Sequence, residues 1–453
     1  MFRKILIANR SEIAVRVIRA CREMDIRSVA VYSEADRESL HVRLADEAVC
    51  IGPGPAAGSY LSFDAILSAA RATSAEAVHP GYGFLAENAD FCQACRDAGL
   101  RFIGPAPAAI RRLGFKSEAR DLAREAGVPI VPGSPGLLGE DFMAEAAKVG
   151  FPVMVKAAAG GGGKGLRLVR NPKDLEAQVR MAKAEAKAAF KDDSIYLEKY
   201  IEHPRHVEIQ VAADGVGGIV AFPERDCTVQ RRHQKLIEES PSPAVTPEIR
   251  ERMQDAARAL ARAAGYDNVG TVEFLLDTDG SFYFMEVNTR LQVEHPVTEL
   301  VTGLDLVNVQ IRLAAGEELP FGQDRASEIR VHSIEHRINA EDPAHSFAPS
   351  PGLIGRVELP GGPGVRVDTH IYAGYTVPSY YDSLIAKLIV AAPDREQAIA
   401  RGVRALGEFA IEGVKTTIPF HREVLTHRLF REGKFDTKFI DAMKEKKEMH
   451  PVP

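Results

Sequence analysis

The sequence has no apolar run long enough to cross a membrane, since a spanning helix needs about 20 consecutive apolar residues. It also has no excess of basic residues: the formal net charge is −6, which argues against a nucleic-acid-binding face spread over the molecule. A strand-like run at residues 5–8 opens the chain, with no signal peptide or transit segment before it. We therefore expect a cytoplasmic protein with no membrane or nucleic-acid partner.

Cysteine is scarce, and two common nucleotide-binding motifs are missing. Five cysteines, an odd number in a chain of 453 residues, do not indicate a disulfide framework. Cys92 and Cys95 form a C-x-x-C pair, but no second pair follows for zinc, so packing cysteines are the better interpretation. The first strand–helix turn lacks G-x-G-x-x-G. Lys164 is followed by Gly165 rather than by Ser or Thr, which excludes a Walker A loop.

The composition of the chain is typical of a globular protein. The chain is 45% hydrophobic and 26% charged, and its length suggests about three domains. Residues 1–113 alternate strand-like and helix-like segments, which predicts a parallel sheet. Asn9 or Ser11 is expected to cap the first helix. The loop at residues 79–88, HPGYGFLAEN, displays Tyr82 on a tight turn, or packs that ring on the core.

A different pattern begins after residue 113. An amphipathic helix ends at Gly127, and two later strands are joined by residues 160–165, GGGGKG. The N–H groups of such a run can fold over phosphates as a movable lid, although a flexible hairpin tip has the same composition. Lys156 favours the lid, because a lysine within an apolar strand is costly to bury without an anion.

Residues 285–296, MEVNTRLQVEHP, place polar side chains at every second position. In an extended strand these point to one face, which would carry two carboxylates, two amides and a guanidinium. A solvated strand face is the alternative interpretation. Thr289 breaks the apolar alternation, and a bend is expected there.

The segment before this run reads as the other strand of a hairpin. We expect a register in which Glu273 lies opposite Phe284, with Glu286 diagonal to Glu273 on the same face. Two carboxylates and Asn288 are hard oxygen ligands suited to Mg²⁺ that bridges nucleotide phosphates. A metal would also relieve the repulsion between the two carboxylates.

Other polar clusters in the sequence can also be interpreted either as binding sites or as ordinary surface. Basic side chains crowd into one short stretch, namely Arg225, Arg231, Arg232, His233 and Lys235. A basic surface is the usual explanation, but the flanking apolar strands favour a structured anion pocket. Arg337 lies between apolar neighbours in EHRINAEDP. Residues 442–444, AMK, match the core of a biotin-attachment site, yet a charged helical tail fits better because the strands on both sides are missing.

Several long strings occur together in one order: KILIANRSEIA, HPGYGFLAEN, KAAAGGGGKG, RHVEIQV, ERDCTVQRRHQK, MEVNTRLQVEHPVTE, RINAEDP and HIYAGYTVPSYYDSLIAKLI. Together they make the chain resemble the biotin carboxylase component of biotin-dependent carboxylases, which are ATP-grasp enzymes. Two departures stand out. Ser11 replaces a glycine that is usual in this family, which a helix start is expected to tolerate. Phe115 replaces an acidic residue that is usual before Lys116.

The resemblance implies a mixed α/β and α+β fold of three domains. These are an N-terminal parallel-sheet (pre-ATP-grasp) domain at residues 1–113, an ATP-grasp region at 114–317 and a C-terminal biotin carboxylase domain at 330–445. The glycine-rich lid would lie within the second, at about residues 131–203. Members of this family are commonly homodimers.

The resemblance also implies four groups of site residues. ATP would contact Lys116, Lys156, Gly162, Gly163, Glu198, Lys199, Tyr200, Ile201, His206, Gln230, His233, Glu273 and Glu286. Mg²⁺ or Mn²⁺ would be held by Glu273, Glu286 and Asn288. Bicarbonate would be bound by Lys235, Arg290, Gln292, Val293 and Glu294, and biotin by Arg337, Tyr82 and Asp382. The catalytic residues would be Arg290, Glu294, Lys235 and Arg337.

The implied activity is the ATP-dependent carboxylation of biotin by bicarbonate. It would pass through carboxyphosphate and give N-carboxybiotin, ADP and phosphate. The biotin would arrive on a separate biotin carboxyl carrier protein. Carboxyltransferase subunits would pass the group to acetyl-CoA, another acyl-CoA, pyruvate or another 2-oxo acid. The alternatives are another ATP-grasp ligase that forms a different acyl phosphate, and a non-catalytic nucleotide-binding subunit.

Overall fold

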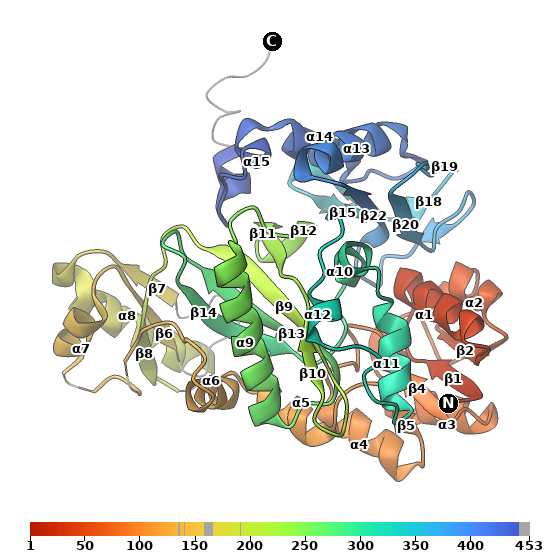
Figure 1. Cartoon of the computed structure of the whole chain (residues 1–453), viewed down its shortest axis with the longest axis horizontal. Coiled ribbons are helices and arrows are strands. Elements are labelled where there is room, and N and C mark those ends of the chain that lie inside the picture. Colours follow the sequence, from red (N-terminus) through yellow and green to blue (C-terminus); the bar gives the residue numbers. More distant parts are fainter. Residues whose placement is uncertain (135, 140, 158–165, 191, 444–453) are drawn as a thin grey trace.

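The chain forms a body built on two sheets of different type, from which a third, smaller sheet projects (Figure 1). The computed structural model describes residues 1–443 apart from 135, 140, 158–165 and 191. Gly162, Gly163 and Lys164 of the expected lid loop lie outside the described residues, as does Lys444. The mixed α/β and α+β fold class expected from the sequence is confirmed.

The N-terminal sheet has five parallel strands in the order β3–β2–β1–β4–β5. Its strands are β1 (Lys4–Ile7), β2 (Arg27–Tyr32), β3 (Glu47–Cys50), β4 (Ala77–His79) and β5 (Arg101–Phe102). The helices are α1 (Ser11–Glu23), α2 (Leu40–Leu44), α3 (Phe63–Ala72), α4 (Ala89–Asp97) and α5 (Pro107–Gly114). Ile5, Leu6 and Ile7 are all buried, as a parallel sheet covered on both faces requires.

The turn from β1 into α1 differs from the expectation that Asn9 or Ser11 caps the helix. Arg10 is the N-cap residue, and no side chain caps it. Asn9 instead donates its amide to two carbonyls of the loop at residues 79–88. Ser11 has φ 65°, in the left-handed region that costs an L-residue about 1–2 kcal/mol. Its hydroxyl lies 2.8 Å from Nδ1 of His370, so the serine that replaces the glycine gains a hydrogen bond but strains the backbone.

The projecting unit is a three-stranded antiparallel sheet in the order β7–β6–β8. It comprises β6 (Val153–Ala157), β7 (Leu166–Val169), β8 (Ile195–Lys199), α7 (Phe142–Val149) and α8 (Leu175–Phe190). Val153, Val155 and Leu197 belong to a small core of its own. The helix α6 (Lys116–Glu125), which the sequence predicted, leads into this unit. A separate core and a single side of attachment suit a lid (Figure 1).

The central sheet is antiparallel, with the path β14–β13–β9–β11–β12–β15–β22–β20 and β10 paired to β9. Its strands are β9 (Arg205–Ala213), β10 (Ile219–Ala221), β11 (Arg225–Arg231), β12 (Gln234–Ser240), β13 (Asn268–Leu276), β14 (Phe282–Asn288), β15 (His332–Asn339), β20 (Val365–Thr369) and β22 (Leu384–Ala392). The pairing of β12 with β15 carries this sheet across the boundary between the second and third predicted domains.

Helices pack against this sheet and connect its strands: α9 (Pro247–Ala264), α10 (His295–Thr302), α11 (Leu306–Ala314), α12 (Gln323–Ala326), α13 (Arg395–Glu408), α14 (Ile418–Thr426) and α15 (Arg428–Arg431). Three two-stranded pairs complete the C-terminal part, namely β16 (Glu341–Asp342) with β17 (Ala348–Pro349), β18 (Gly352–Leu353) with β21 (Thr376–Val377), and β19 (Arg356–Glu358) with β23 (Ala410–Glu412). Residues 439–443 are helical, in agreement with the expected helical tail.

The β13–β14 hairpin has a different register from the one expected. Glu273 lies opposite Glu286 rather than opposite Phe284. The turn pairs Leu276 with Phe282, which shifts the expected register by one residue, and a bulge after Glu273 shifts it by one more. The two carboxylates are therefore direct cross-strand neighbours instead of diagonal ones. β14 ends at Asn288 and the chain bends at the next residue, so the polar alternation of residues 285–294 is not one straight strand.

The cysteine pair lies within α4, away from any second pair of thiols in the described residues. Cys92 and Cys95 are buried there, and burial raises the pKa of the two thiols to about 11 and about 12. Such thiols pack as small apolar groups. In the described part of the chain, no helix combines the length and the apolar character that a membrane crossing requires.

The strained turn at Ser11 predicts an order of stability between two variants. Ser11→Ala and Ser11→Gly both lose the hydrogen bond to His370, but only alanine keeps the left-handed strain. We expect the glycine variant to be more stable by about 1 kcal/mol and to show the higher Tm in thermal unfolding. Equal Tm values, or a more stable alanine variant, would contradict the strain at this position.

Candidate active site

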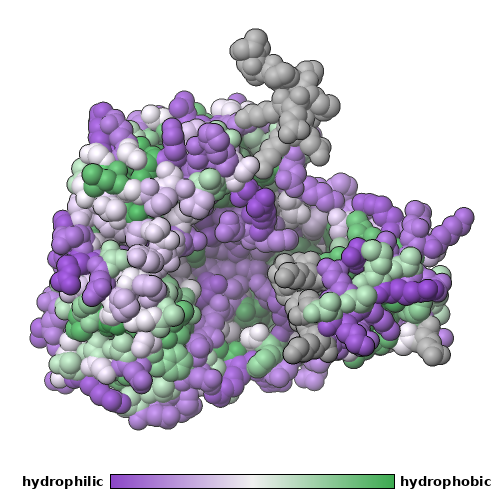
Figure 2. Space-filling view, turned by 180° about the vertical axis from the view of Figure 1, so that it is seen from behind, coloured by the Kyte–Doolittle hydropathy of each residue, from purple (hydrophilic) through white to green (hydrophobic). Residues whose placement is uncertain are grey.

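A cavity of about 1310 Å³ lies among the N-terminal sheet, the lid sheet and the central sheet. Figure 2 shows the hollow, with hydrophilic side chains along much of its wall. Every expected site residue that the structure describes lines it: Tyr82, Lys116, Lys156, Glu198, Lys199, Tyr200, Ile201, His206, Gln230, His233, Lys235, Glu273, Glu286, Asn288, Arg290, Gln292, Val293, Glu294, Arg337 and Asp382.

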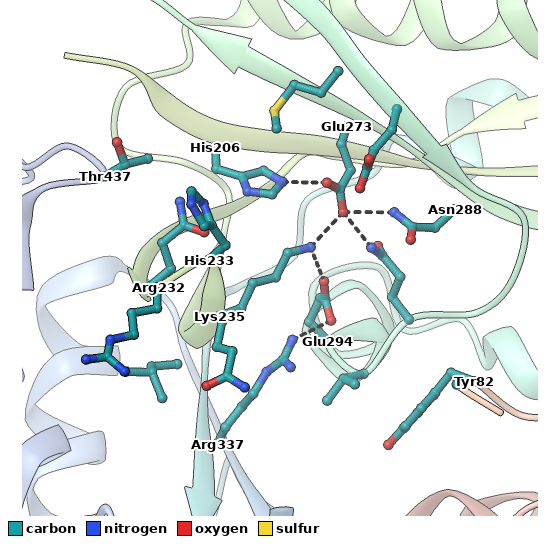
Figure 3. Close-up of a pocket in the computed structure, with 18 of the residues that line it drawn as sticks. Tyr82, His206, Arg232, His233, Lys235, Glu273, Asn288, Glu294, Arg337 and Thr437 are labelled. Atoms are coloured by element: carbon teal, nitrogen blue, oxygen red, sulfur yellow. Dashed lines mark hydrogen bonds and ion pairs between the residues drawn. The ribbon is translucent and has the colours of Figure 1, made fainter. Parts of the chain in front are cut away.

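Lys235 on β12 occupies the middle of this cavity wall (Figure 3). Its Nζ lies 2.6 Å from Glu208 Oε2, 2.9 Å from Glu273 Oε1 and 2.6 Å from Glu294 Oε1. An ammonium group has three N–H donors, so the three carboxylates satisfy it completely. Burial disfavours the charge, but the surrounding anionic groups outweigh it and raise the pKa of Lys235 well above its ordinary value.

Glu273 on β13 collects more contacts than any neighbour drawn in Figure 3. Besides Lys235, its Oε1 accepts from the amides of Asn288 and Gln292, each at 2.9 Å, and its Oε2 lies 3.0 Å from Nε2 of His206. Burial opposes ionisation, but Lys235 and His206 outweigh it and hold the pKa of Glu273 well below its ordinary value. The carboxylate is therefore charged and available as a ligand.

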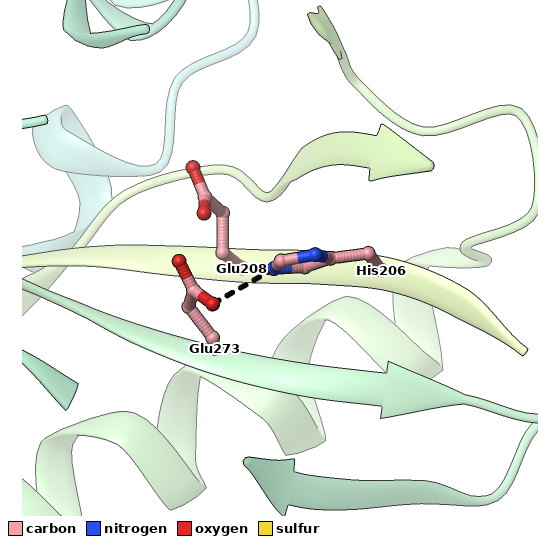
Figure 4. A group of neighbouring side chains, drawn as sticks. All are labelled: His206, Glu208 and Glu273. Carbon is pink, nitrogen blue, oxygen red and sulfur yellow. Dashed lines mark ion pairs between the residues drawn. The ribbon is translucent and has the colours of Figure 1, made fainter. Parts of the chain in front are cut away.

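The oxygen atoms of Glu273 and its neighbours are suitable ligands for a divalent cation. Glu286 faces Glu273 across the hairpin, and its half-exposed carboxylate lies 3.3 Å from Nζ of Lys116. Asn288 donates its amide N–H, and its Oδ1 points toward Arg290 at 3.0 Å. Two carboxylates and an amide oxygen are the hard ligands that Mg²⁺ prefers. His206, Glu208 and Glu273 also lie together (Figure 4). There Lys235 contacts both carboxylates, whereas in the pair of Glu273 and Glu286 it contacts Glu273, and the half-exposed Glu286 lies beside Lys116.

Glu294 joins Lys235 to a second cation. Its Oε2 lies 2.8 Å from Nη2 of Arg337, whose Nε lies 2.6 Å from Oε1 of the buried Glu238. Burial opposes ionisation of Glu294, but Lys235 and Arg337 hold its pKa well below the ordinary value. Burial raises the pKa of Glu238 to about 7, although Arg337 partly offsets the effect. The arginine thus binds one carboxylate that is fully ionised and one that titrates near neutrality.

A buried arginine below the cavity surface orients the side-chain amide of Gln292. Arg225 is fully buried, and its guanidinium donates to Glu208 Oε1 at 2.6 Å and to Gln292 Oε1 at 2.7 Å. With its oxygen held in this way, Gln292 must turn its NH₂ group toward Glu273. The two ends of the basic stretch, Arg225 and Lys235, therefore belong to a structured pocket, as the sequence predicted, whereas Arg232 and His233 are exposed.

A second cluster of charged side chains lies on the lid side of the cavity. Lys156 and Arg120 both pair with the carboxylate of Glu198. Burial lowers the pKa of Lys156 to about 8. The ammonium of Lys199 is engaged elsewhere, because it donates to two carbonyls of the loop at residues 150–151, each at 3.0 Å.

The remaining expected residues are spread along the cavity wall. Gln230 pairs with Lys235 across the β11–β12 hairpin, and His233 lies at its tip with φ 67°. The hydroxyl of Tyr82 is buried without a hydrogen-bond partner among the described residues. Asp382 is exposed and accepts from the N–H of Leu384. Tyr82 and Asp382 line the same cavity as Arg337 from elements far away in the sequence.

Sequence reasoning missed Glu87, which holds the segment after β14. Its Oε2 lies 2.7 Å from Nε of Arg290, and its Oε1 accepts from the N–H of Thr289 at 3.0 Å. Glu208 was missed too, and Glu238 counted only as support for an anion pocket, although carboxylates within otherwise apolar strands are a readable signal. The loop at residues 79–88, which carries both Glu87 and Tyr82, therefore contributes to the site rather than only packing on the core.

A projecting unit with its own small core, beside a cavity lined with carboxylates fit for a divalent cation and with clustered cations, is the arrangement of an ATP-dependent ligase of the ATP-grasp type. Family models agree along the chain. They match residues 1–110 (Biotin carboxylase, N-terminal domain), 116–321 (Carbamoyl-phosphate synthase L chain, ATP binding domain) and 335–442 (Biotin carboxylase C-terminal domain).

Biotin carboxylase 1 of Bacillus subtilis is 54% identical over 98% of this chain and 99% of its own length. The biotin carboxylase domain of a 2-oxoglutarate carboxylase from Hydrogenobacter thermophilus, a dimer in complex with MgADP, ADP and bicarbonate, is 48% identical. It superposes with a TM-score of 0.89 over 98% of each chain. The chain belongs to the biotin carboxylase family, whose activity is the ATP-dependent carboxylation of biotin.

The contact between Glu87 and Arg290 predicts that loss of the Glu87 charge weakens bicarbonate binding but not ATP binding. Glu87→Gln keeps an oxygen for the N–H of Thr289 but removes the charge that orients Arg290. We expect the KM for bicarbonate to rise about tenfold, the size of one lost charge-assisted hydrogen bond, with little change in the KM for ATP. Steady-state kinetics of ADP release would measure both constants.

Asp90→Asn serves as the matched control, because it removes a nearby carboxylate whose pair with Arg111 is exposed. A similar rise in both variants, or no change in Glu87→Gln, would contradict the role given to Glu87.

Proposed function

We propose that the described side chains carry out the two half-steps of biotin carboxylation in one cavity, with Glu294 at the junction. The observation that supports this most directly is that one carboxylate contacts both Lys235 and Arg337. On one side Lys235 contacts Glu273, which would hold the metal, and on the other Arg337 contacts Glu294 in a cavity that Tyr82 and Asp382 also line (Figure 3). Bicarbonate activation and biotin carboxylation would then take place on either side of this one carboxylate.

In this proposal the lid end binds the nucleotide. The ATP contacts are those named from the sequence: Lys116, Lys156, Gly162, Gly163, Glu198, Lys199, Tyr200, Ile201, His206, Gln230, His233, Glu273 and Glu286. The pair of Lys156 with Glu198 places a cation at the cavity wall, where phosphate oxygens can compete for it. Glu273, Glu286 and Asn288 would hold Mg²⁺ or Mn²⁺, which supplies charge neutralisation for the β- and γ-phosphates when bound.

Bicarbonate would lie against Lys235, Arg290, Gln292, Val293 and Glu294. Glu294 removes the bicarbonate proton, while Lys235 and Arg290 hold the oxyanion. An oxygen of the resulting dianion attacks the γ-phosphorus of ATP, the bond from that phosphorus to the bridging oxygen breaks, and carboxyphosphate and ADP form. A closed lid excludes the water that would hydrolyse carboxyphosphate.

The low pKa of Glu294 has a physical consequence for this step. Lys235 and Arg337 suppress its basicity because both cations contact its carboxylate directly. A bicarbonate that binds Lys235 shares the charge of that ammonium with Glu294 and makes the carboxylate a stronger base. Substrate binding therefore activates its own general base.

The second half-step transfers CO₂. Carboxyphosphate breaks down to CO₂ and phosphate, and the phosphate trianion takes the proton from the ureido nitrogen of biotin. Arg337 stabilises the enolate oxygen that develops, and the deprotonated nitrogen attacks CO₂ to give N-carboxybiotin. A guanidinium suits this position because it stays charged and presents a planar fork of donors to the anion. Tyr82 and Asp382 would border the biotin.

Biotin would arrive on a separate biotin carboxyl carrier protein, and carboxyltransferase subunits would use the product. We propose a homodimer in the cytoplasm. Relatives of this chain include a pyruvate carboxylase subunit from Methanothermobacter thermautotrophicus, 52% identical over 97% of this chain and 90% of its own length. The carboxyltransferase, not the residues around Glu294, would therefore choose the final acceptor.

The direct test is an ADP-release assay with ATP, Mg²⁺ and bicarbonate, with and without free biotin. We expect release to require bicarbonate and to rise with biotin. Glu294→Gln should lose the bicarbonate-dependent part, because the amide cannot accept the proton. ADP release that ignores both substrates would contradict the proposal. Turnover by Glu294→Gln at the wild-type rate would remove the role of Glu294 as base.

Arg337 can be tested by keeping its charge. Arg337→Lys leaves a cation beside the buried Glu238 and Glu294 but cannot bridge them as the two donors of arginine do. We expect biotin carboxylation to fall by about 10²–10³, the usual loss for one oxyanion donor. ADP binding, measured by calorimetry, should stay unchanged. Wild-type carboxylation by this variant would exclude Arg337 as the group that stabilises the enolate.

A further inference from the structure

The segment that follows β14 carries most of the expected bicarbonate ligands but has little regular backbone pairing. β14 ends at Asn288 and α10 begins at His295. Side chains take over the hydrogen bonds that a strand ladder would make. Nη1 of Arg290 contacts the carbonyl of Leu291 at 3.3 Å, and Nδ1 of His295 contacts the carbonyl of Gln292 at 2.8 Å. The conformation of this segment therefore depends on these side-chain hydrogen bonds.

The next carbonyl along this segment is held from a different part of the chain. Nζ of Lys387, on β22, donates to the carbonyl oxygen of Val293 at 2.8 Å. Lys387 is fully buried and does not belong to the cavity lining. Its ammonium also lies 5.8 Å from the centre of the Tyr82 ring. It therefore stands behind the cavity wall, between the expected bicarbonate and biotin ends.

The counter-ion of Lys387 comes from the N-terminal sheet region. Oε2 of Glu12, in the first turn of α1, lies 3.2 Å from Nζ of Lys387. Glu12 is buried, and neither of its carboxylate oxygens has a hydrogen-bond partner among the described residues. Burial raises the pKa of Glu12 to about 7, although Lys387 opposes the shift. One ammonium thus ties α1, β22 and the segment after β14 together.

Stability alone gives little reason for such a pair. Replacing a buried ion pair by apolar side chains of similar volume is often neutral or stabilising. Here the acid has no hydrogen bond to offset its desolvation, which makes the pair costlier still. A role for the ammonium at the Val293 carbonyl explains why a charged donor lies at this buried position.

We propose that Lys387, paired with Glu12, is a positioning residue that fixes the peptide group between Val293 and Glu294. A trans peptide is planar, so holding the carbonyl oxygen of Val293 sets the plane from which the Glu294 side chain departs. Lys387 acts on bicarbonate through this peptide and touches neither substrate nor nucleotide. The inference rests on the proposed function, because Val293 and Glu294 are there assigned to bicarbonate.

The test compares Lys387→Met with Glu12→Gln/Lys387→Met. The single variant leaves Glu12 buried without its cation, whereas the double variant removes both charges. Both variants lack the donor to the Val293 carbonyl. We expect the double variant to recover the Tm that the single variant loses. We expect both to show a KM for bicarbonate raised at least about tenfold, with the KM for ATP within about twofold of the wild type.

Arg395→Met is the matched control for a general loss of stability. Arg395 forms a partly buried ion pair with the buried Glu239 at 2.7 Å and does not belong to the cavity lining. Its variant should lower the Tm and leave the KM for bicarbonate unchanged. The wild type is assayed first: failure to release ADP in response to bicarbonate would contradict the proposed function itself.

With an active wild type, two results would overturn the role of Lys387 alone. The first is a double variant with a wild-type KM for bicarbonate. The second is a double variant that has also lost ADP binding, because Lys387 would then support the whole scaffold rather than the bicarbonate pocket.

Discussion

The charge balance around the ammonium of Lys235 is the constraint on which the site depends. Three carboxylates from β9, from β13 and from the start of α10 lie within hydrogen-bond distance of that one group. Without it they would repel one another, and each would raise the pKa of the others. Leaving buried charges unpaired typically costs about 3–5 kcal/mol. The convergence of three strands and one helix on this point is therefore a condition of folding as well as of chemistry.

The arrangement also explains why the cavity has two ends with different chemistry. Glu273 connects Lys235 to the proposed metal ligands, and Glu294 connects Lys235 to Arg337. In the proposed mechanism the same ammonium therefore neutralises a carboxylate on the nucleotide side and lowers the basicity of Glu294 on the biotin side. A change of charge at Lys235 would act on both ends through local electrostatics.

Much of this could be predicted from the sequence, because the information is local. Apolar runs indicated the parallel sheet, amphipathic spacing indicated α6, and the long family strings assigned the residues that line the cavity. The register of the β13–β14 hairpin was wrong, because neither the one-residue shift at the turn nor the bulge after Glu273 leaves a clear mark in composition. The cap of α1 was wrong as well, since Ser11 has a left-handed backbone that its residue type does not reveal.

The supports of the segment after β14 were beyond sequence reasoning for a different reason. Glu87 lies 203 residues before the arginine that it holds, and Lys387 lies 94 residues after the carbonyl that it binds. Only the tertiary fold brings such groups together. The domain boundaries at residues 113, 317 and 330 stay predictions. The central sheet continues from β12 to β15, so the segment between residues 317 and 330 connects two parts of one sheet.

That sheet limits how the polypeptide could be divided into fragments. A cut between α12 and β15 would separate β12 from its neighbour and leave each piece with a long, unpaired strand at its edge. Unprotected edges of this kind pair with other chains and aggregate. The lid, attached through its own small sheet, could instead be exchanged or trimmed without opening an edge in the body. An engineer would therefore keep the third domain together with the part of the second domain that forms the central sheet, and would handle the lid within the second domain as a separate unit.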